Sequence, residues 1–134
     1  MALEANSQDS SAKKRFLFVV STGMNEPKKA FTPFYYASAA AAMGYETFLF
    51  FIAEGPSLLK KDVAQSLKTT DDGEPLQKVV DLALKSGVKF LVCSVAAKVI
   101  WKMDQKDLPE GAQFAGAATL IEMASDPDTA VVYF

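Results

Sequence analysis

The chain of 134 residues contains a single cysteine, Cys93, and no histidine. One thiol cannot form an intramolecular disulfide, a CxxC redox pair or a four-cysteine metal site. Without histidine, Ser-His-Asp and Cys-His catalysis are excluded, as is every metal site that needs an imidazole ligand. We therefore expect no metal and no cofactor, and chemistry that relies on one thiolate. A lone cysteine also excludes a disulfide-stapled secreted domain and predicts a cytoplasmic location.

The position of Cys93 favours a reactive thiol. It closes an apolar run, residues 88–93, that predicts a buried strand, and a short helix is expected directly after it, over residues 94–103. Ser94 is a candidate N-cap for that helix. The backbone amides of Ser94 and Val95 and the positive end of the helix dipole would then lie near the sulfur and favour the thiolate.

Lysines on the same expected helix supply further positive charge. Lys98 and Lys102 are four residues apart and would share one helix face, so Lys98 could help to hold an anionic group on the sulfur. The competing interpretation is that the lysines form only a solvated face and that Cys93 is a small, inert, buried residue.

The body of the chain alternates strand patterns with helix patterns. We expect strands over residues 15–21, 47–52, 88–93, 113–115 and 129–134, and helices over residues 33–43, 57–68, 76–86, 94–103 and 116–125. This order predicts right-handed βαβ units and a parallel sheet that is covered by helices on both faces.

Ligands of such sheets bind outside the carboxyl ends of the strands. Besides Cys93, this rule selects Thr22 and Gly23 after the first strand, and Glu54 and Gly55 after the second. The first pair could bind an anion through backbone amides, although the loop lacks both dinucleotide and P-loop glycine patterns. The second pair is also compatible with a simple turn.

The composition is that of one globular domain. Half of the residues are hydrophobic, 22% are charged, and the formal net charge is −2. Such a balance does not favour nucleic-acid binding, which needs a basic surface. Residues 1–14 are polar and predict a flexible tail without a secretory signal, so the domain should span residues 15–134. No apolar run approaches the roughly 20 residues of a membrane span.

Several segments resemble the DsrE/DsrF-like sulfur-carrier family. They are GVKFLVCS at residues 87–94, DLPEGAQFAGAAT at residues 107–119, the terminal VVYF, and the earlier GYET and AEG around the second strand. The order and spacing of these segments carry the resemblance, which covers residues 15–134.

The resemblance implies a three-layer α/β/α sandwich with a five-stranded parallel sheet, assembled as a homotrimer or hexamer. It implies that Cys93 carries sulfur as a persulfide or thiosulfonate and exchanges it with TusA-like or rhodanese-like proteins, in sulfur oxidation or tRNA thiolation. Some relatives carry a second cysteine in the chain. Here there is one, so a mechanism with two thiols per chain is not expected.

Two other classes of function stay open. The chain could be a non-catalytic oligomeric adaptor in which Cys93 is inert. An aromatic cluster early in the first helix, at Phe31, Phe34, Tyr35 and Tyr36, could form a subunit contact, line a pocket or belong to the core. The chain could also be a small-molecule binding domain that uses the strand ends without covalent chemistry.

Overall fold

The computed structural model describes residues 12–134. The predicted flexible tail, residues 1–14, therefore lies outside the described residues except for its last three positions. Of these, Lys14 is hydrogen-bonded on both sides. Its N–H donates to the Asp128 carbonyl at 2.9 Å, and its carbonyl accepts from the N–H of Glu46 at 3.2 Å.

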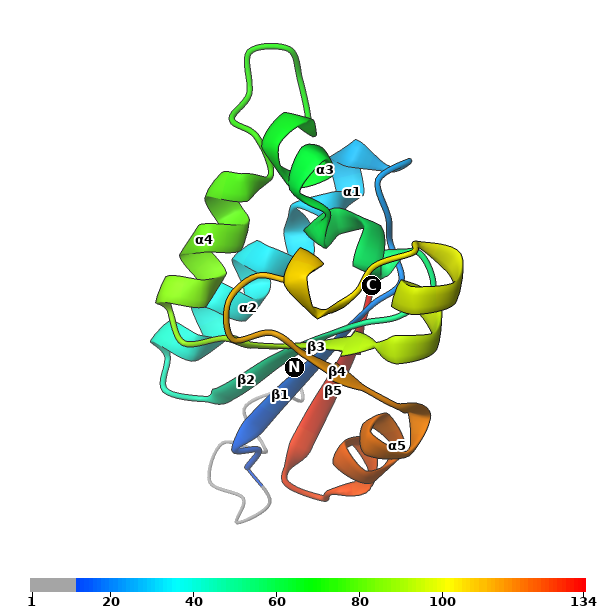
Figure 1. The fold of residues 1–134 in the computed structure, drawn as a ribbon. Helices are drawn as coiled ribbons and strands as arrows, with labels where there is room; N and C mark the ends of the chain where they lie inside the picture. The colour runs from blue at the N-terminus through cyan, green and yellow to red at the C-terminus, as the bar shows by residue number, and fades with distance from the viewer. Residues whose placement is uncertain (1–11) are drawn as a thin grey trace.

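The centre of the protein is a five-stranded parallel sheet, as expected (Figure 1). Its strand order is β4-β3-β2-β1-β5. The strands are β1 Arg15–Val20, β2 Glu46–Phe51, β3 Lys89–Cys93, β4 Gln113–Ala115 and β5 Thr129–Tyr133. Side chains on both faces of β1 and β2 are buried at their carboxyl-terminal halves, which explains their nearly continuous apolar sequences.

The helical segments connect these strands. They are α1 Pro27–Ala30, α2 Thr32–Ala42, η2 Gly55–Leu59, α3 Lys61–Ser66, α4 Gln77–Lys85, η3 Ala96–Ile100, η4 Gln105–Asp107 and α5 Ala117–Ser125. The helix expected over residues 57–68 is wrong as a continuous element, because Lys60 adopts an extended conformation and separates η2 from α3. Among the helices of residues 12–134, none has the length and apolar character needed to cross a membrane.

The main core lies on the face of the sheet that carries α2 and α4 (Figure 1). The predicted apolar face of α4 is confirmed, because Leu76, Val79, Val80 and Ala83 are all buried. The alanine-rich helix α2 packs closely on the sheet, with Phe34 and Ala37 both 0% exposed. Phe34, Phe51 and Phe90 form an aromatic group whose ring centroids are 5.4–6.0 Å apart.

The opposite face of the sheet has a much smaller core. Its buried residues are Leu17, Val19 and Phe50, against which Leu120 and Met123 of α5 pack. No residue of α5 itself is buried, and Ile121 is 66% exposed. The second helical layer therefore covers this face only in part.

Candidate functional site

Cys93 is the last residue of β3 and carries a free thiol. It is paired in register with Ala115 of β4. Because side chains alternate along a strand, Cys93 packs with the small cluster of Leu17, Val19 and Phe50, on the sheet face opposite the main core. The residue is half-buried. The thiol thus lies in apolar surroundings at the carboxyl edge of the sheet, with part of the residue reaching solvent.

The helix after Cys93 differs from the expectation. Ser94 is already helical, since the strand runs directly into the helix, and the segment continues as a five-residue π-helix, η3. The N-cap prediction for Ser94 is wrong, because a cap must stay outside the helical conformation and no side-chain cap hydrogen bond is made at the start of η3. The amides of Ser94 and Val95 nevertheless belong to a first turn, where amides lack intrahelical acceptors.

Large apolar side chains of this segment face outward. Ala96 and Ala97 are buried, whereas Val95, Val99 and Ile100 are 67%, 61% and 58% exposed. The two alanines allow the segment to pack closely on the body of the protein. The valines and the isoleucine therefore add to an exposed apolar surface next to the cysteine.

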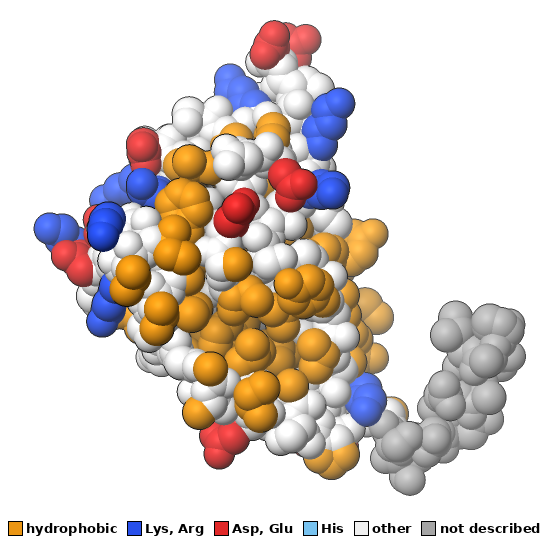
Figure 2. All heavy atoms as spheres, turned by 90° about the vertical axis from the view of Figure 1, so that its right-hand side faces the viewer, with side chains coloured by type: hydrophobic (Ala, Val, Ile, Leu, Met, Phe, Trp, Pro, Cys, Tyr) orange, Lys and Arg blue, Asp and Glu red, His pale blue; other side chains and the backbone are white. Residues whose placement is uncertain are grey.

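Figure 2 shows hydrophobic side chains gathered on one side of the protein, where η3, α5 and β5 lie. We call this set the apolar surface. The large hydrophobic side chains that are exposed on these elements and at the start of the helix before η3 are Val95, Val99, Ile100, Ile121, Val131 and Tyr133. The aromatic residues expected to cluster early in the first helix do not share one environment. Phe34 is in the core, while Tyr35 and Tyr36 on α2 are more than half exposed.

Lys98 and Lys102 do not share a helix face, so this prediction is wrong. The helix ends before Lys102, which has a left-handed backbone with φ of 56°. The Lys98 ammonium lies 4.6 Å from the ring centroid of Phe114, in a cation–π contact. Phe114 packs on the main core, whereas Cys93 packs on the other face. A contact between Lys98 and the sulfur stays a prediction.

The loops after β1 and β2 are in close contact, as the strand order requires. A Cβ added to Gly23 would lie 2.7 Å from both Cβ and the carbonyl oxygen of Glu54, and Gly55 closely approaches the Val20 carbonyl. The Ser57 hydroxyl donates to the Glu54 carbonyl at 2.7 Å and accepts from the Met24 amide at 3.1 Å.

The structure thus brings the four predicted loop residues together. Thr22 and Gly23 are buried, and the neighbouring Met24 amide is already bonded to Ser57. Glu54 is exposed. The loop after β2 lies one strand away from Cys93 along this edge of the sheet, and the loop after β1 lies two strands away. A substrate-binding role for Thr22, Gly23, Glu54 and Gly55 stays a prediction.

Trp101 connects the segment after Cys93 to the end of β2. Its indole Nε1–H donates to the Ala53 carbonyl at 2.9 Å. Ala53 has a left-handed backbone, with φ of 53°. The sequence gives little indication of this contact, since Trp101 is the only tryptophan but lies in no recognisable motif.

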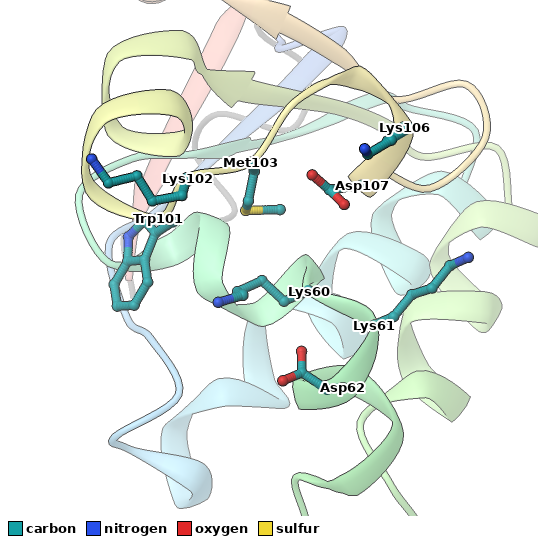
Figure 3. Close-up of a pocket in the computed structure, with 8 residues that line it drawn as sticks. All are labelled: Lys60, Lys61, Asp62, Trp101, Lys102, Met103, Lys106 and Asp107. Atoms are coloured by element: carbon teal, nitrogen blue, oxygen red, sulfur yellow. The ribbon is translucent and has the colours of Figure 1, made fainter.

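Beside Trp101 lies a cavity of about 480 Å³ (Figure 3). One wall comes from Lys60, Lys61 and Asp62, and the other from Trp101, Lys102, Met103, Lys106 and Asp107. We call it the lysine pocket. The N–H of Asp104 donates to the Asp107 carboxylate at 2.9 Å, and this bond is the main reason that the pKa of Asp107 is lowered from its ordinary 3.8.

Fold and site together define a class of protein: a single parallel α/β unit whose only thiol stands at the carboxyl edge of the sheet. The chain belongs to the DsrE/DsrF-like family, because the sequence model of that family matches residues 14–134. The family resemblance stated from the sequence is thereby confirmed.

Comparisons with individual proteins agree with this assignment. The chain is 30% identical to an uncharacterized protein of Methanocaldococcus jannaschii over 118 residues, which is 87% of this chain but only 42% of that protein. It is 25% identical, over 140 aligned residues, to the sulfur carrier protein DsrE2 of Allochromatium vinosum, covering 74% of this chain and 86% of that one.

Two solved structures share the fold. The ychN protein of E. coli superposes with a TM-score of 0.69 at 13% identity, over 91% of this chain and 99% of that chain. A protein of unknown function from Methanobacterium thermoautotrophicum has a TM-score of 0.69 at 16% identity, over 91% and 100%. At such identities these likenesses describe the fold alone.

Proposed function

We propose that the protein is a sulfur carrier that holds sulfane sulfur, or a thiosulfate group, covalently on Cys93 and passes it to a thiol of a partner protein. Membership of the DsrE/DsrF-like family and the similarity to a relative named as a sulfur carrier support a sulfur-related role. The observation that carries the finer proposal is that the only thiol of the chain is free and half-buried at the carboxyl edge of the sheet.

Loading needs only one thiolate. With a persulfide donor, the Cys93 thiolate attacks the outer sulfur, a new Sγ–S bond forms, and the S–S bond of the donor breaks. The electron pair of that bond leaves with the donor thiolate, and the proton of the persulfide stays with the transferred sulfur. With tetrathionate, the same attack leaves an S-thiosulfonate on Cys93 and releases thiosulfate.

Unloading repeats the exchange in the other direction. A partner thiolate attacks the outer sulfur of the Cys93 persulfide, the Sγ–S bond breaks, and Cys93 leaves as a thiolate. No histidine, metal or second cysteine takes part in either step. The first-turn amides of Ser94 and Val95 would hold the anionic terminal group, and Lys98 would do so after moving from the Phe114 ring.

The neighbours of Cys93 leave room for this exchange. Ala115, its register partner, has a small side chain, and a Cβ built on the following Gly116 would meet nothing within 4 Å. A bulky residue beside the thiol should therefore close the route. Ala115→Leu is expected to slow alkylation of Cys93 by iodoacetamide, whereas Ala118→Leu, on the exposed side of α5, should leave the rate unchanged.

We further propose that the carrier works as a homotrimer or hexamer in the cytoplasm. The apolar surface supports this assembly, because clustered exposed apolar side chains on a soluble domain commonly mark interfaces. Val99→Glu together with Ile121→Glu should then lower the mass measured by sedimentation to that of one chain. If the wild-type protein already sediments as a monomer at micromolar concentration, the assembly proposal is wrong.

The transfer experiment uses a TusA-like and a rhodanese-like protein as acceptors. Cys93 is loaded with polysulfide, excess donor is removed, and the masses of both proteins are followed. The proposal predicts that one sulfur leaves Cys93 as the acceptor gains it, and that Cys93→Ser is neither loaded nor active. Loading without transfer to any thiol acceptor would contradict the carrier function, and a Cys93 that never loads would favour an oligomeric adaptor.

A further inference from the structure

The lysine pocket is large enough for a small molecule and has no part in the sulfur exchange described above. Its volume of about 480 Å³ falls within the range of small-molecule sites, roughly 300–1,000 Å³. Figure 3 shows the two walls, one from the η2–α3 junction and one from the chain that follows η3, facing each other across the opening. Residues distant in the sequence therefore converge on one hollow.

The charge of the lining is opposite to that of the protein. Four lysines and two aspartates line the pocket, whereas the whole chain has a formal net charge of −2. One of the aspartates, Asp107, is already engaged by the Asp104 amide. Within residues 12–134, no carboxylate lies at ion-pair distance from the ammonium groups of Lys60, Lys61 or Lys102. These three lysines therefore form no ion pair among the described residues, although Asp62 and Asp107 line the same pocket.

Lys102 ends the segment after η3 in a left-handed backbone conformation. Lys102 follows the C-cap residue Trp101 and has a φ of 56°, a conformation that glycine or asparagine usually adopts after a helix. The N–H of Met103 donates to the Ala97 carbonyl at 2.8 Å and closes the helix end. Glycine would allow the same closure without strain, whereas the lysine present adds a side chain to the lining of the pocket.

The other two lining residues, Trp101 and Met103, are hydrophobic. Trp101 and Met103 belong to the same wall as Lys102. The hydrogen bond from the indole Nε1 to the Ala53 carbonyl fixes the plane of the ring. A rigid indole beside several ammonium groups can contact a planar group of a ligand while the lysines bind its anionic end.

We propose that the lysine pocket binds a small molecule that carries a diphosphate group next to a planar apolar group, as in a nucleoside diphosphate. Lys60 and Lys102, from opposite walls, bind the phosphate oxygens, and the planar group packs on Trp101. The Lys102 side chain, whose ammonium points away from the hollow in Figure 3, turns inward to do so. Lys61 and Lys106 add positive charge at the opening. Binding is reversible and involves no covalent step at Cys93.

The test uses the fluorescence of Trp101, which lines the pocket and is the only tryptophan of the chain. The full chain is titrated with ADP, pyrophosphate, adenosine and a hexaglutamate peptide. The proposal predicts a saturable change with ADP, a weaker affinity for pyrophosphate, the weakest for adenosine, and a loss of affinity as salt is added. No saturable change with ADP or pyrophosphate up to millimolar concentration would overturn it, as would tighter binding of the peptide.

Variants separate binding from folding. Lys60→Gln and Lys102→Gln should each weaken ADP binding by at least about fivefold, whereas Lys85→Gln, at the far end of α4, should not. Lys102→Gly should weaken binding while the melting temperature stays level or rises, because glycine relieves the left-handed strain. Unchanged affinity in Lys60→Gln and Lys102→Gly would contradict the proposal. Cys93→Ser should bind ADP normally, so this site and the sulfur-carrier function can fail separately.

Discussion

The Trp101 indole donates a hydrogen bond to the Ala53 carbonyl, and this bond joins positions 48 residues apart in the sequence. Ala53 lies in the turn after β2, and Trp101 ends the helix that starts directly after Cys93. The bond therefore ties the two neighbouring strand ends together at the edge of the sheet where Cys93 stands.

Trp101→Phe should loosen this connection. Phenylalanine keeps an aromatic ring but has no N–H, so the Ala53 carbonyl would lose its partner. We expect the free energy of unfolding to fall by about 1 kcal/mol. Hydrogen exchange should also become faster in η3 and not in α4. Equal exchange in η3 of both proteins would show that the bond does not hold this segment.

Gly55 should not tolerate a side chain. A Cβ at this position would overlap the Val20 carbonyl, which belongs to the backbone of β1 and cannot rotate away. Gly55→Ala should therefore lower the free energy of unfolding by about 1–3 kcal/mol in urea denaturation. Gly116→Ala is the matched control, because its Cβ would meet nothing within 4 Å and its φ is −110°. Equal stability of the two variants would refute the packing argument.

Arg15 should contribute more to stability than Lys89, which pairs with the same carboxylate, that of Glu46. Its Nε lies 2.9 Å from Glu46 Oε1, and its Nη1 lies 3.0 Å from Asp126 Oδ2. A lysine cannot bridge both carboxylates with this fork geometry, so Arg15→Lys should cost about 1 kcal/mol, and less at high salt. Lys89→Gln, which breaks a more exposed pair of 3.5 Å with Glu46, should change stability by less than about 0.5 kcal/mol. Equal effects of the two substitutions would contradict this ranking.

Asp107 should make stability depend on pH. The Asp104 amide, and to a lesser extent Lys106 and Lys60, lower the pKa of Asp107 below 3.8 in the folded protein. A carboxyl with a lowered folded pKa stabilises the protein above the unfolded pKa, and this contribution is lost as pH falls toward the folded value. Asp107→Asn should thus be less stable than wild type at pH 7, and the difference should shrink below pH 3.8. A difference in melting temperature that is independent of pH would contradict this cause.

Periodicity and strand composition were sufficient to predict the parallel sheet and the main core. The spacing of Leu76, Val79, Val80 and Ala83 places them on one helical face, and all four are buried. The same kind of spacing does not lead to burial for Val95, Val99 and Ile100. These residues are apolar at helical spacing but point outward, because two buried alanines let the short helix pack through its small side. Hydrophobic spacing alone does not distinguish a helix side that is buried from one that is exposed.

The position of Cys93 could be predicted because it depends on one strand and the helix after it. The surroundings of the thiol could not be predicted from the sequence. Ser94 was expected to cap a helix that in fact begins at Ser94 itself, and Lys102 was expected on a helix that ends before it. The lysine pocket depends on the conformation of Lys60 and Lys102 and on contacts between distant segments, which no local pattern encodes.

The most direct test of the account is the intact mass of the protein after incubation with polysulfide, tetrathionate or thiosulfate, with Cys93→Ser as the control. Serine is nearly isosteric, so the variant should fold like the wild type, which circular dichroism checks. The account predicts that wild-type protein gains the mass of sulfur or of a thiosulfate group on Cys93, that dithiothreitol reverses the gain, and that Cys93→Ser gains nothing. A folded wild-type protein that gains no mass with any of the three donors would contradict it.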